Sequence, residues 1–376
     1  MISKAQLRNS NDGQSQRGSL IYSIKPIPEI IGTFPATRYY GSKRKLLHWI
    51  YDCVKSFEFE TVLDAFGGSG TVSQLFRAMR KEVTYSDAFQ FNVDIARSTL
   101  TGEELIGKEQ VEQFLATVSP IEGTVARNFQ AIFFLDDENR WIDGFMETLR
   151  SSDFSTPERA MLKTLLYQAC LKKRPFNLFH RANLSIRTNK NVVRSFGNFT
   201  TWEKAFPEHI LQTYDELSSY RPDRLRSATI LPCGDICAVA PGYDLVYLDP
   251  PYVSTSERAN RDNYWLRYHF LEGLAQYDDW ERGIIKDSKV RKFIEPPHFS
   301  TWSSRKTFKE NLFDLIDTHK RSIVVLSYVK EAYPDDATIQ AFFESKFAKV
   351  SIHSTEHHHA LGLAKKRELL FIGVPS

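Results

Sequence analysis

Residues 244–252, with the sequence Asp-Leu-Val-Tyr-Leu-Asp-Pro-Pro-Tyr, constrain the fold of this 376-residue chain more than any other stretch. The apolar residues 245–248 are typical of a short, buried strand. The two prolines that follow cannot continue a sheet ladder, so the strand has to stop at Asp249. Ligands of open α/β sheets bind at the carboxyl ends of the strands. The stretch therefore predicts a carboxylate, a rigid turn and an aromatic ring, Tyr252, at a ligand-binding edge.

This combination suits the activation of an exocyclic amino group, such as that of adenine. The nitrogen of that group is a poor nucleophile, because its lone pair is conjugated into the ring. Asp249 and the carbonyl of Pro250 would each accept one N–H and favour a pyramidal nitrogen that can attack. Pro251 keeps the turn rigid, and Tyr252 offers a face on which a base taken out of its helix can stack. The alternative is a structural turn, in which Asp249 is a cap and Tyr252 a packing residue.

A second ligand-binding turn is predicted earlier in the chain. Residues 61–66 have the pattern of a strand, residues 67–70 (Gly-Gly-Ser-Gly) that of a tight turn, and residues 71–80 that of a helix. A glycine-rich turn between a strand and a helix lets a ligand approach the backbone closely. Its spacing differs from the GxGxxG of dinucleotide-binding folds, so no pyrophosphate is implied. The next predicted strand, residues 82–87, ends in an acid about 20 residues after the glycines, where such folds hold a ribose hydroxyl pair.

The N-terminal part contributes a third candidate. Residues 1–30 begin polar and predict a flexible arm. Residues 44–50 have apolar side chains at helical spacing, which places Gly41 and Ser42 in the turn that enters a helix. Such a turn beside Lys43 suits a bound carboxylate, although an ordinary helix cap with a surface lysine has the same sequence.

A basic stretch lies in a mostly helical region between about residues 96 and 224. From Arg159 to Trp202 the chain has nine Lys or Arg residues and no Asp or Glu. Arg, Asn and aromatic residues alternate within residues 174–187, and such side chains contact phosphates and read base edges. The alternative is a solvated surface of a helical subdomain. We expect DNA contacts from Lys172, Lys173, Arg174, Asn177, Arg181, Asn183, Arg187 and Lys190, with the lysines on phosphate and at least one base reader among Arg181, Asn183 and Arg187.

The remaining features argue against other classes of protein. The net charge of +3 is nearly neutral, and no apolar run is long enough to span a bilayer. Cys233 and Cys237 lack a second Cys/His pair at zinc spacing, so we expect buried free thiols in a reducing cytosol. A final antiparallel pair of strands is predicted at residues 349–353 and 368–374. We expect the histidine triplet at 357–359 to lie in a loop and to bind no metal, because neighbouring side chains of an extended chain point apart.

In their order along the chain, these motifs resemble DNA adenine-N6 methyltransferases of the class that contains the bacterial DNA adenine methylases. The match comprises Tyr39-Tyr-Gly-Ser-Lys43, Asp64-Ala-Phe-Gly-Gly-Ser-Gly70, Asp87 and Asp249-Pro-Pro-Tyr252. Residues 176–183, followed by Phe196 and Gly197, resemble the family's DNA-contacting hairpin region more loosely. The resemblance covers roughly residues 36–376.

The resemblance implies an α/β, Rossmann-like methyltransferase fold with a mostly parallel sheet. Residues 31–95 and 225–376 would form the catalytic domain, and residues 96–224 a mostly helical insert for target recognition. The implied reaction is direct transfer of a methyl group from S-adenosylmethionine to N6 of a flipped adenine at a specific site in double-stranded DNA. It implies a cytoplasmic, prokaryotic or phage protein, accompanied in a restriction-modification system by a cognate restriction endonuclease.

The resemblance also implies where the cofactor binds. Tyr39 and Lys43 would lie at its methionine end, with the ammonium of Lys43 near the carboxylate. Asp87 would hold the ribose hydroxyls, and Asp235 would lie near the adenine ring. Residues 253–280 would form a loop and helix that close over the flipped base. The implied set also includes Tyr40, which stands where many relatives have a smaller residue, together with Asp64, Phe66, Gly67, Gly68, Gly70 and Asp249.

Two other classes of function compete with this interpretation. A related enzyme would methylate RNA adenine or a protein glutamine, although glutamine methyltransferases resemble this motif with Asn in place of Asp249. The other alternative is a DNA-binding relative without activity, whose cofactor site would have decayed. The intact cofactor and catalytic motifs therefore favour an active DNA methyltransferase.

Overall fold

The computed structural model describes residues 26–34, 38–39, 41–101, 106–175, 178–189, 191, 199–219, 226–254, 263–330, 332–358 and 365–376. Most of the predicted arm, residues 1–25, lies outside these ranges. So do Tyr40, Asn177, Lys190, Phe196 and Gly197.

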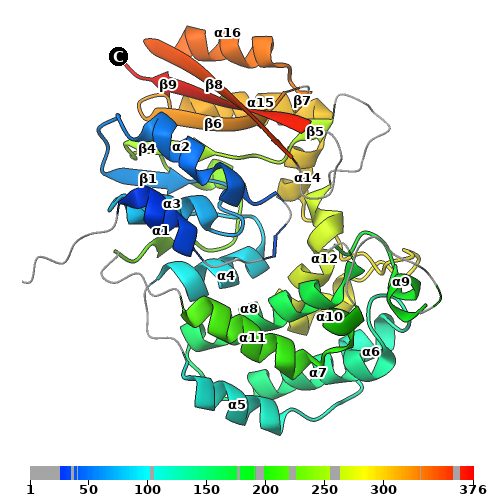
Figure 1. Ribbon diagram of the computed structural model, residues 1–376. Coiled ribbons are helices and arrows are strands. Elements are labelled where there is room, and N and C mark those ends of the chain that lie inside the picture. The colour runs from blue at the N-terminus through cyan, green and yellow to red at the C-terminus, as the bar shows by residue number, and fades with distance from the viewer. Residues whose placement is uncertain are drawn as a thin grey trace, which may run out of the picture.

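A seven-stranded sheet forms the upper half of the molecule (Figure 1). Its first five strands are parallel, and β9 runs antiparallel to the strand on either side. This confirms the predicted mixed α/β fold with a mostly parallel sheet. In spatial order the strands are β3 (Thr229–Ile230), β2 (Glu82–Tyr85), β1 (Thr61–Asp64), β4 (Leu245–Leu248), β6 (Ile323–Val329), β9 (Lys365–Val374) and β8 (Lys349–His358).

The chain reverses its direction of travel across the sheet between β1 and β4. From β1 it passes to β2 on one side, and β4 and β6 lie on the other. The register pairs Asp64 with Tyr247, so the turn after β1 and the turn after β4 emerge side by side. Open sheets bind ligands at such a switch point.

Helices cover both faces of the sheet because its central strands are apolar on both sides. Leu245 and Tyr247 of β4 point into one core, and Val246 and Leu248 point into the other. The first core is closed by α1 (Ile27–Thr33), η1 (Lys43–Leu46), α2 (Leu47–Val54) and α3 (Thr71–Ala78). The second is closed by α14 (Pro297–Ser303), α15 (Arg305–Thr318) and α16 (Asp336–Lys346), beside the small pair β5 (Val253–Ser254) and β7 (Ala332–Tyr333).

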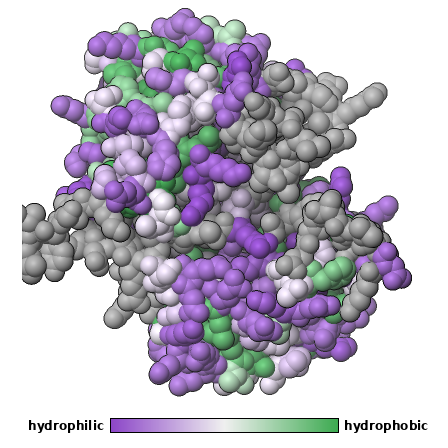
Figure 2. Space-filling view, in the orientation of Figure 1, coloured by the Kyte–Doolittle hydropathy of each residue, from purple (hydrophilic) through white to green (hydrophobic). Residues whose placement is uncertain are grey.

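A helical subdomain forms the lower half of Figure 1, and its visible face is mostly hydrophilic (Figure 2). At its centre is α8 (Thr156–Lys173), in which thirteen of eighteen residues are buried. No helix in the described ranges combines the length and apolar content needed to cross a membrane. Around α8 the subdomain has the helices α4 (Gln90–Leu100), α5 (Lys108–Thr117), α6 (Thr124–Asn128), α7 (Asp136–Arg150), α9 (Leu184–Thr188), α10 (Phe199–Glu203) and α11 (Phe206–Ser218).

Helix α12 (Tyr264–Ala275) follows the Asp-Pro-Pro-Tyr turn but belongs to the helical core. Ten of its twelve residues are buried, and Trp265, Phe270 and Leu271 belong to the same hydrophobic core as the buried side chains of α4, α7 and α8. The helix predicted within residues 253–280 is confirmed as α12. That this segment closes over the base stays a prediction, and residues 255–262 of its loop lie outside the described ranges. The helical core also extends to Phe299, beyond the predicted insert of residues 96–224.

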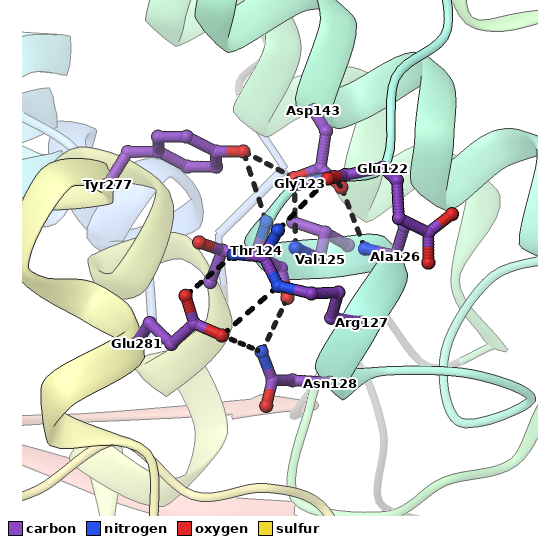
Figure 3. A network of polar contacts seen from close by, with 10 residues as sticks. All are labelled: Glu122, Gly123, Thr124, Val125, Ala126, Arg127, Asn128, Asp143, Tyr277 and Glu281. Carbon is purple, nitrogen blue, oxygen red and sulfur yellow. Dashed lines mark hydrogen bonds and ion pairs between the residues drawn. The ribbon is translucent and has the colours of Figure 1, made fainter.

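Polar contacts fasten α6 to the chain that follows α12 (Figure 3). The Asp143 carboxylate of α7 accepts hydrogen bonds from three backbone N–H groups at the start of α6 and from the hydroxyl of Tyr277. The Glu281 carboxylate accepts from Arg127 and Asn128 of α6. Tyr277 begins α13 (Tyr277–Trp280), and Glu281 begins η5 (Glu281–Gly283).

The closing strands are longer than predicted. Strand β8 pairs with β9 over ten residue pairs, the last of which joins His358 to Lys365. His357 and His358, which we expected in a loop, therefore lie in a strand. Backbone pairing between antiparallel strands continues there independently of side-chain pattern. The strand expected within residues 227–235 is, in contrast, only the two residues of β3.

Candidate active site

A pocket of about 790 Å³, including its open mouth, lies at the carboxyl ends of β1 and β4. It brings together ten of the residues that the sequence predicted, from four separate parts of the chain. They are Tyr39, Lys43, Asp64, Phe66, Gly67, Gly68, Asp87, Asp249, Pro250 and Pro251.

Three predicted residues lie outside the pocket wall. Gly70 has φ 72° and caps the start of α3, where a side chain would meet Leu100 rather than a ligand. The Asp235 carboxylate accepts a hydrogen bond from the Cys237 N–H and caps η3 (Ile236–Ala238). Cys237, which we expected to be buried, is exposed in this turn. Tyr252 is the third, and its ring stands edge-on to Tyr328.

The turn after β1 requires glycine for two reasons. Gly68 has φ 52°, which is the left-handed region that costs glycine little. A Cβ on Gly67 would lie 2.1 Å from the ring of Tyr85. The turn thus keeps bare backbone at the pocket, as the sequence predicted.

A cluster of charged and polar groups surrounds Asp249. The Lys43 ammonium lies 2.8 Å from Asp249 Oδ1 and donates to the Tyr252 hydroxyl at 2.9 Å. The same hydroxyl lies 3.2 Å from Asp249 Oδ1 and 3.1 Å from Glu368 Oε2. Lys43 and Glu368 are buried, and the Asp249 side chain is 17% exposed. The Tyr252 hydroxyl therefore contacts all three charged groups, and that its ring receives a base stays a prediction.

Glu368 is a site residue that the sequence analysis missed. It lies in β9 and reaches Tyr252 from across the sheet. The available signal was an acid directly before the apolar run 369–372, in a strand with buried side chains on both faces. A charge at such a place needs a partner, and the partner is more than a hundred residues away in sequence.

Burial and neighbouring charges act against each other in this cluster. Burial alone would lower the pKa of Lys43, but Asp249 and Glu368 outweigh it and raise the pKa. Burial raises the pKa of Asp249, and Lys43 opposes that shift. Lys43 consequently stays protonated, and its ammonium opposes the protonation of Asp249 that burial favours.

Asp87 holds the turns of the pocket together. Its Oδ2 accepts from the Gly68 N–H at 2.8 Å, and its Oδ1 accepts from the Phe89 N–H at 2.8 Å and from the Asn92 amide at 3.0 Å. Burial raises the pKa of this carboxyl, and the hydrogen bonds oppose the shift. Asp87 thus links the glycine turn to the start of α4.

Asp64 is the most strongly perturbed carboxyl in the pocket wall. Burial raises its pKa from 3.8 to about 7, although the Ser73 hydroxyl donates to it at 2.6 Å. Between these values the folded state keeps a proton that the unfolded chain releases, so the free energy of unfolding falls as the pH rises. Across this window Asp64 should lower the free energy of unfolding of the wild type by up to about 1.4 kcal/mol per pH unit. We expect Asp64→Asn to lack this contribution.

Urea unfolding of both proteins at pH 4.5, 6 and 7.5 measures this effect. The stability of wild type relative to Asp64→Asn should decline from pH 4.5 to 7.5, and then level off. The comparison cancels Glu272, whose pKa burial also raises to about 7. A constant difference across the series would contradict the shift.

Four of the predicted DNA contacts are corrected by the structure. Lys172 donates to Thr213 and Glu216, and Lys173 lies 2.8 Å from Glu138. The side chains of Lys172, Lys173, Arg174 and Arg187 are all buried, so their charged groups are occupied within the protein. The stretch lacks its own acids, but α7 and α11 supply them. The corrected residues are Lys172, Lys173, Arg174 and Arg187.

Arg174 supports the segment that follows it. Its guanidinium donates to the backbone carbonyls of Leu178, Arg181 and Ala182. Arg181 itself is exposed, and Asn183 is half-buried at the start of α9 with φ 53°. Arg181 and Asn183 thus remain accessible among the described members of the predicted DNA-contacting set.

The glycine turn after β1 and the Asp-Pro-Pro-Tyr turn after β4 meet in one pocket, which is the arrangement of a methyltransferase that acts on amino groups. A model of the family "D12 class N6 adenine-specific DNA methyltransferase" matches residues 39–282, and the chain belongs to this family. It is therefore an N6-adenine DNA methyltransferase. The chain is also similar to the type II methyltransferase M2.HphI of Haemophilus parahaemolyticus, with 22% identity over 349 residues, which cover 90% of this chain and 97% of the relative.

Proposed function

We propose that the pocket binds S-adenosylmethionine between the glycine turn and Asp249. Membership of a methyltransferase family implies this cofactor, which supplies a methyl group on an electrophilic, positively charged sulfur. The wall of the pocket suits a cation, since it carries Asp64, Asp87 and Asp249 against a single lysine, Lys43. Burial raises the pKa of each of these carboxyls, and a bound cation would lower it again.

Asp249 is the proposed acceptor of one N–H of the target adenine, and the Pro250 carbonyl is the acceptor of the other. The observation that carries this proposal is that both residues line the same pocket as the glycine turn. Lys43, which we predicted to meet the cofactor carboxylate, pairs with Asp249. We assign it the role of keeping Asp249 ionised. Tyr39, Phe66, Tyr264 and Trp302 are among the aromatic residues that line the pocket.

A direct assay tests the proposed reaction. Purified protein is incubated with S-adenosylmethionine labelled in the methyl group and with duplex DNA, RNA or a glutamine-containing peptide. Mass spectrometry of the digested products should find N6-methyladenine in the DNA and no label in the other two. Label confined to RNA or peptide would overturn the proposed substrate.

Asp87→Asn should weaken the binding of S-adenosylmethionine by roughly 1.5–3 kcal/mol, as expected for the loss of a charge-assisted hydrogen bond. Calorimetric titration measures this change. Asp235→Asn is the matched control, because that carboxylate caps η3 outside the pocket wall. Equal weakening in both variants would place the adenosine near Asp235 as well, and unchanged affinity for Asp87→Asn would move the ribose elsewhere.

We propose that Arg181 and Asn183 read the DNA sequence. Their planar groups match guanine and adenine edges, and both are accessible. Truncating either to Ala should cost roughly 1–3 kcal/mol on the cognate site and relax discrimination at one base pair. Sequencing of methylated positions in cellular DNA gives the site profile. Arg150→Ala, which removes an exposed arginine of α7, should leave that profile unchanged.

We further infer that the chain acts as a modification enzyme of a restriction-modification or phage system. The named relative is a type II methyltransferase. Such an enzyme would act on double-stranded DNA in the cytoplasm and protect it from a cognate restriction endonuclease.

A further inference from the structure

A β-hairpin at residues 283–294 lies outside every motif considered so far. Its strands are joined by the pairing of Ile284 with Phe293 and by two backbone hydrogen bonds, from Ile285 to Lys292 at 2.9 Å and from Ile294 to Gly283 at 2.8 Å. At its tip the N–H of Arg291, which has φ 51°, donates to the carbonyl of Ser288. The hairpin is thus an ordered structure with a defined tip.

The hairpin is anchored to the wall of the active-site pocket. Ile284, Val290 and Phe293 are buried in the helical core. The Trp265 indole donates to the Phe293 carbonyl at 2.7 Å and stacks on the rings of both Phe293 and Phe89. Phe89 lines the pocket, so one indole ring separates the hairpin from the pocket wall.

Helix α12, which carries Trp265, also supports the segment that presents Arg181. The Phe179 N–H donates to the Arg267 carbonyl of α12 at 2.9 Å, and His269 lies 3.2 Å from the Phe179 carbonyl. Figure 1 shows the yellow chain after α12 on the same side of the molecule as α9. Glu281 fixes the start of the hairpin through Arg127 and Asn128 (Figure 3). The hairpin and the proposed base readers therefore share one rigid support.

The tip of the hairpin is strongly basic. Residues 282–292 contain five Lys or Arg and one Asp. Lys286 and Lys289 are exposed, Arg291 is half-buried, and none of the three side chains makes a hydrogen bond or ion pair with the described part of the chain. The hairpin also carries Ile285 and Ile294, two of the five exposed large apolar side chains in the described ranges. Exposed apolar residues beside unpaired cations distinguish it from an ordinary solvated turn.

We propose that the hairpin binds the phosphate backbone of the DNA duplex that flanks the target adenine, through Lys286, Lys289 and Arg291. This inference rests on the proposed function, since it needs DNA at the mouth of the pocket. Lysine is a point charge that meets phosphate rather than base edges, so the hairpin positions DNA without reading sequence. It takes over the phosphate-binding role that the sequence assigned to the buried Lys172 and Lys173.

The test is the salt dependence of DNA binding by the full chain. The triple variant K286Q/K289Q/R291Q removes three charges and keeps side-chain length. At about 0.15 M salt its dissociation constant for a duplex should rise about 10- to 100-fold, equally for duplexes with and without the methylated site. The slope of log Kd against log salt should fall by about 2 to 3, since each phosphate contact contributes about 0.9.

Two further variants make the test specific. K320A/R321A/K349A removes three exposed cations at the amino ends of β6 and β8, the opposite edge of the sheet, and should leave affinity and slope unchanged. K286R/K289R keeps the charge and should keep the slope. If wild type methylates DNA and the triple variant, with an unchanged melting temperature, has the wild-type slope, the hairpin proposal is overturned alone. If wild type neither binds nor methylates DNA, both proposals fail.

Discussion

Asp249→Ala is expected to lower the single-turnover rate of methyl transfer by about 10²–10³-fold, comparable to the loss of one preorganised group from a site that stabilises a transition state. The carboxylate acts as the amino nitrogen becomes pyramidal, so its loss should lower the rate more than the affinity for DNA or cofactor. Lys43, left without its carboxylate partner at 2.8 Å, should add to the loss by placing a less neutralised ammonium beside the reacting nitrogen.

Rapid-quench assays with saturating DNA and S-adenosylmethionine measure this rate. Asp244→Ala is a suitable control, because that carboxylate binds the backbone at Glu60 and Thr61 at the opposite end of the same strand. Its variant should transfer methyl groups at close to the wild-type rate. A near-normal rate for Asp249→Ala itself would contradict the proposed mechanism.

Glu138→Ala is expected to lower the free energy of unfolding by about 3–5 kcal/mol, as found when one partner of a buried ion pair is removed. Glu138 lies between Lys173 and Arg187, and it also accepts from the Leu135 N–H at the start of α7. Arg187 and Lys173 lower its pKa despite the opposing effect of burial. Truncation would leave two buried cations without a carboxylate.

Urea unfolding at pH 7 measures the change. Glu147→Ala, on the same helix, removes an acid from the exposed pair with Arg150 and should leave the stability nearly unchanged. Similar stabilities for both variants would show that Lys173 and Arg187 reach solvent, and they would return to the set of candidate DNA contacts.

The sequence predicted the active-site edge well because its signals are local. A strand stopped by two prolines and a glycine turn before a helix each depend on a few neighbouring residues. The register of β1 and β4 then brings Asp64 and Asp249 to one pocket without further information.

The buried part of the basic stretch was predicted wrongly for the opposite reason. Whether Lys172 or Lys173 faces solvent depends on acids at positions 216 and 138, which no local pattern connects to them. Glu368 was missed in the same way, since only the closed sheet brings it to Tyr252. Residue type identified charges that matter, but not whether their partners lie inside the protein.

The burial of α12 has a consequence for the exchange of recognition specificity between related enzymes. A graft of residues 106–219 alone would carry a helical unit whose core is completed by Trp265, Phe270 and Leu271 of the host. A mismatch there would expose apolar surface that the donor kept covered. A chimera should therefore include α12 and the chain to Phe299, so that the transplanted unit brings both of its separated sequence segments and is joined to the host next to the catalytic turn.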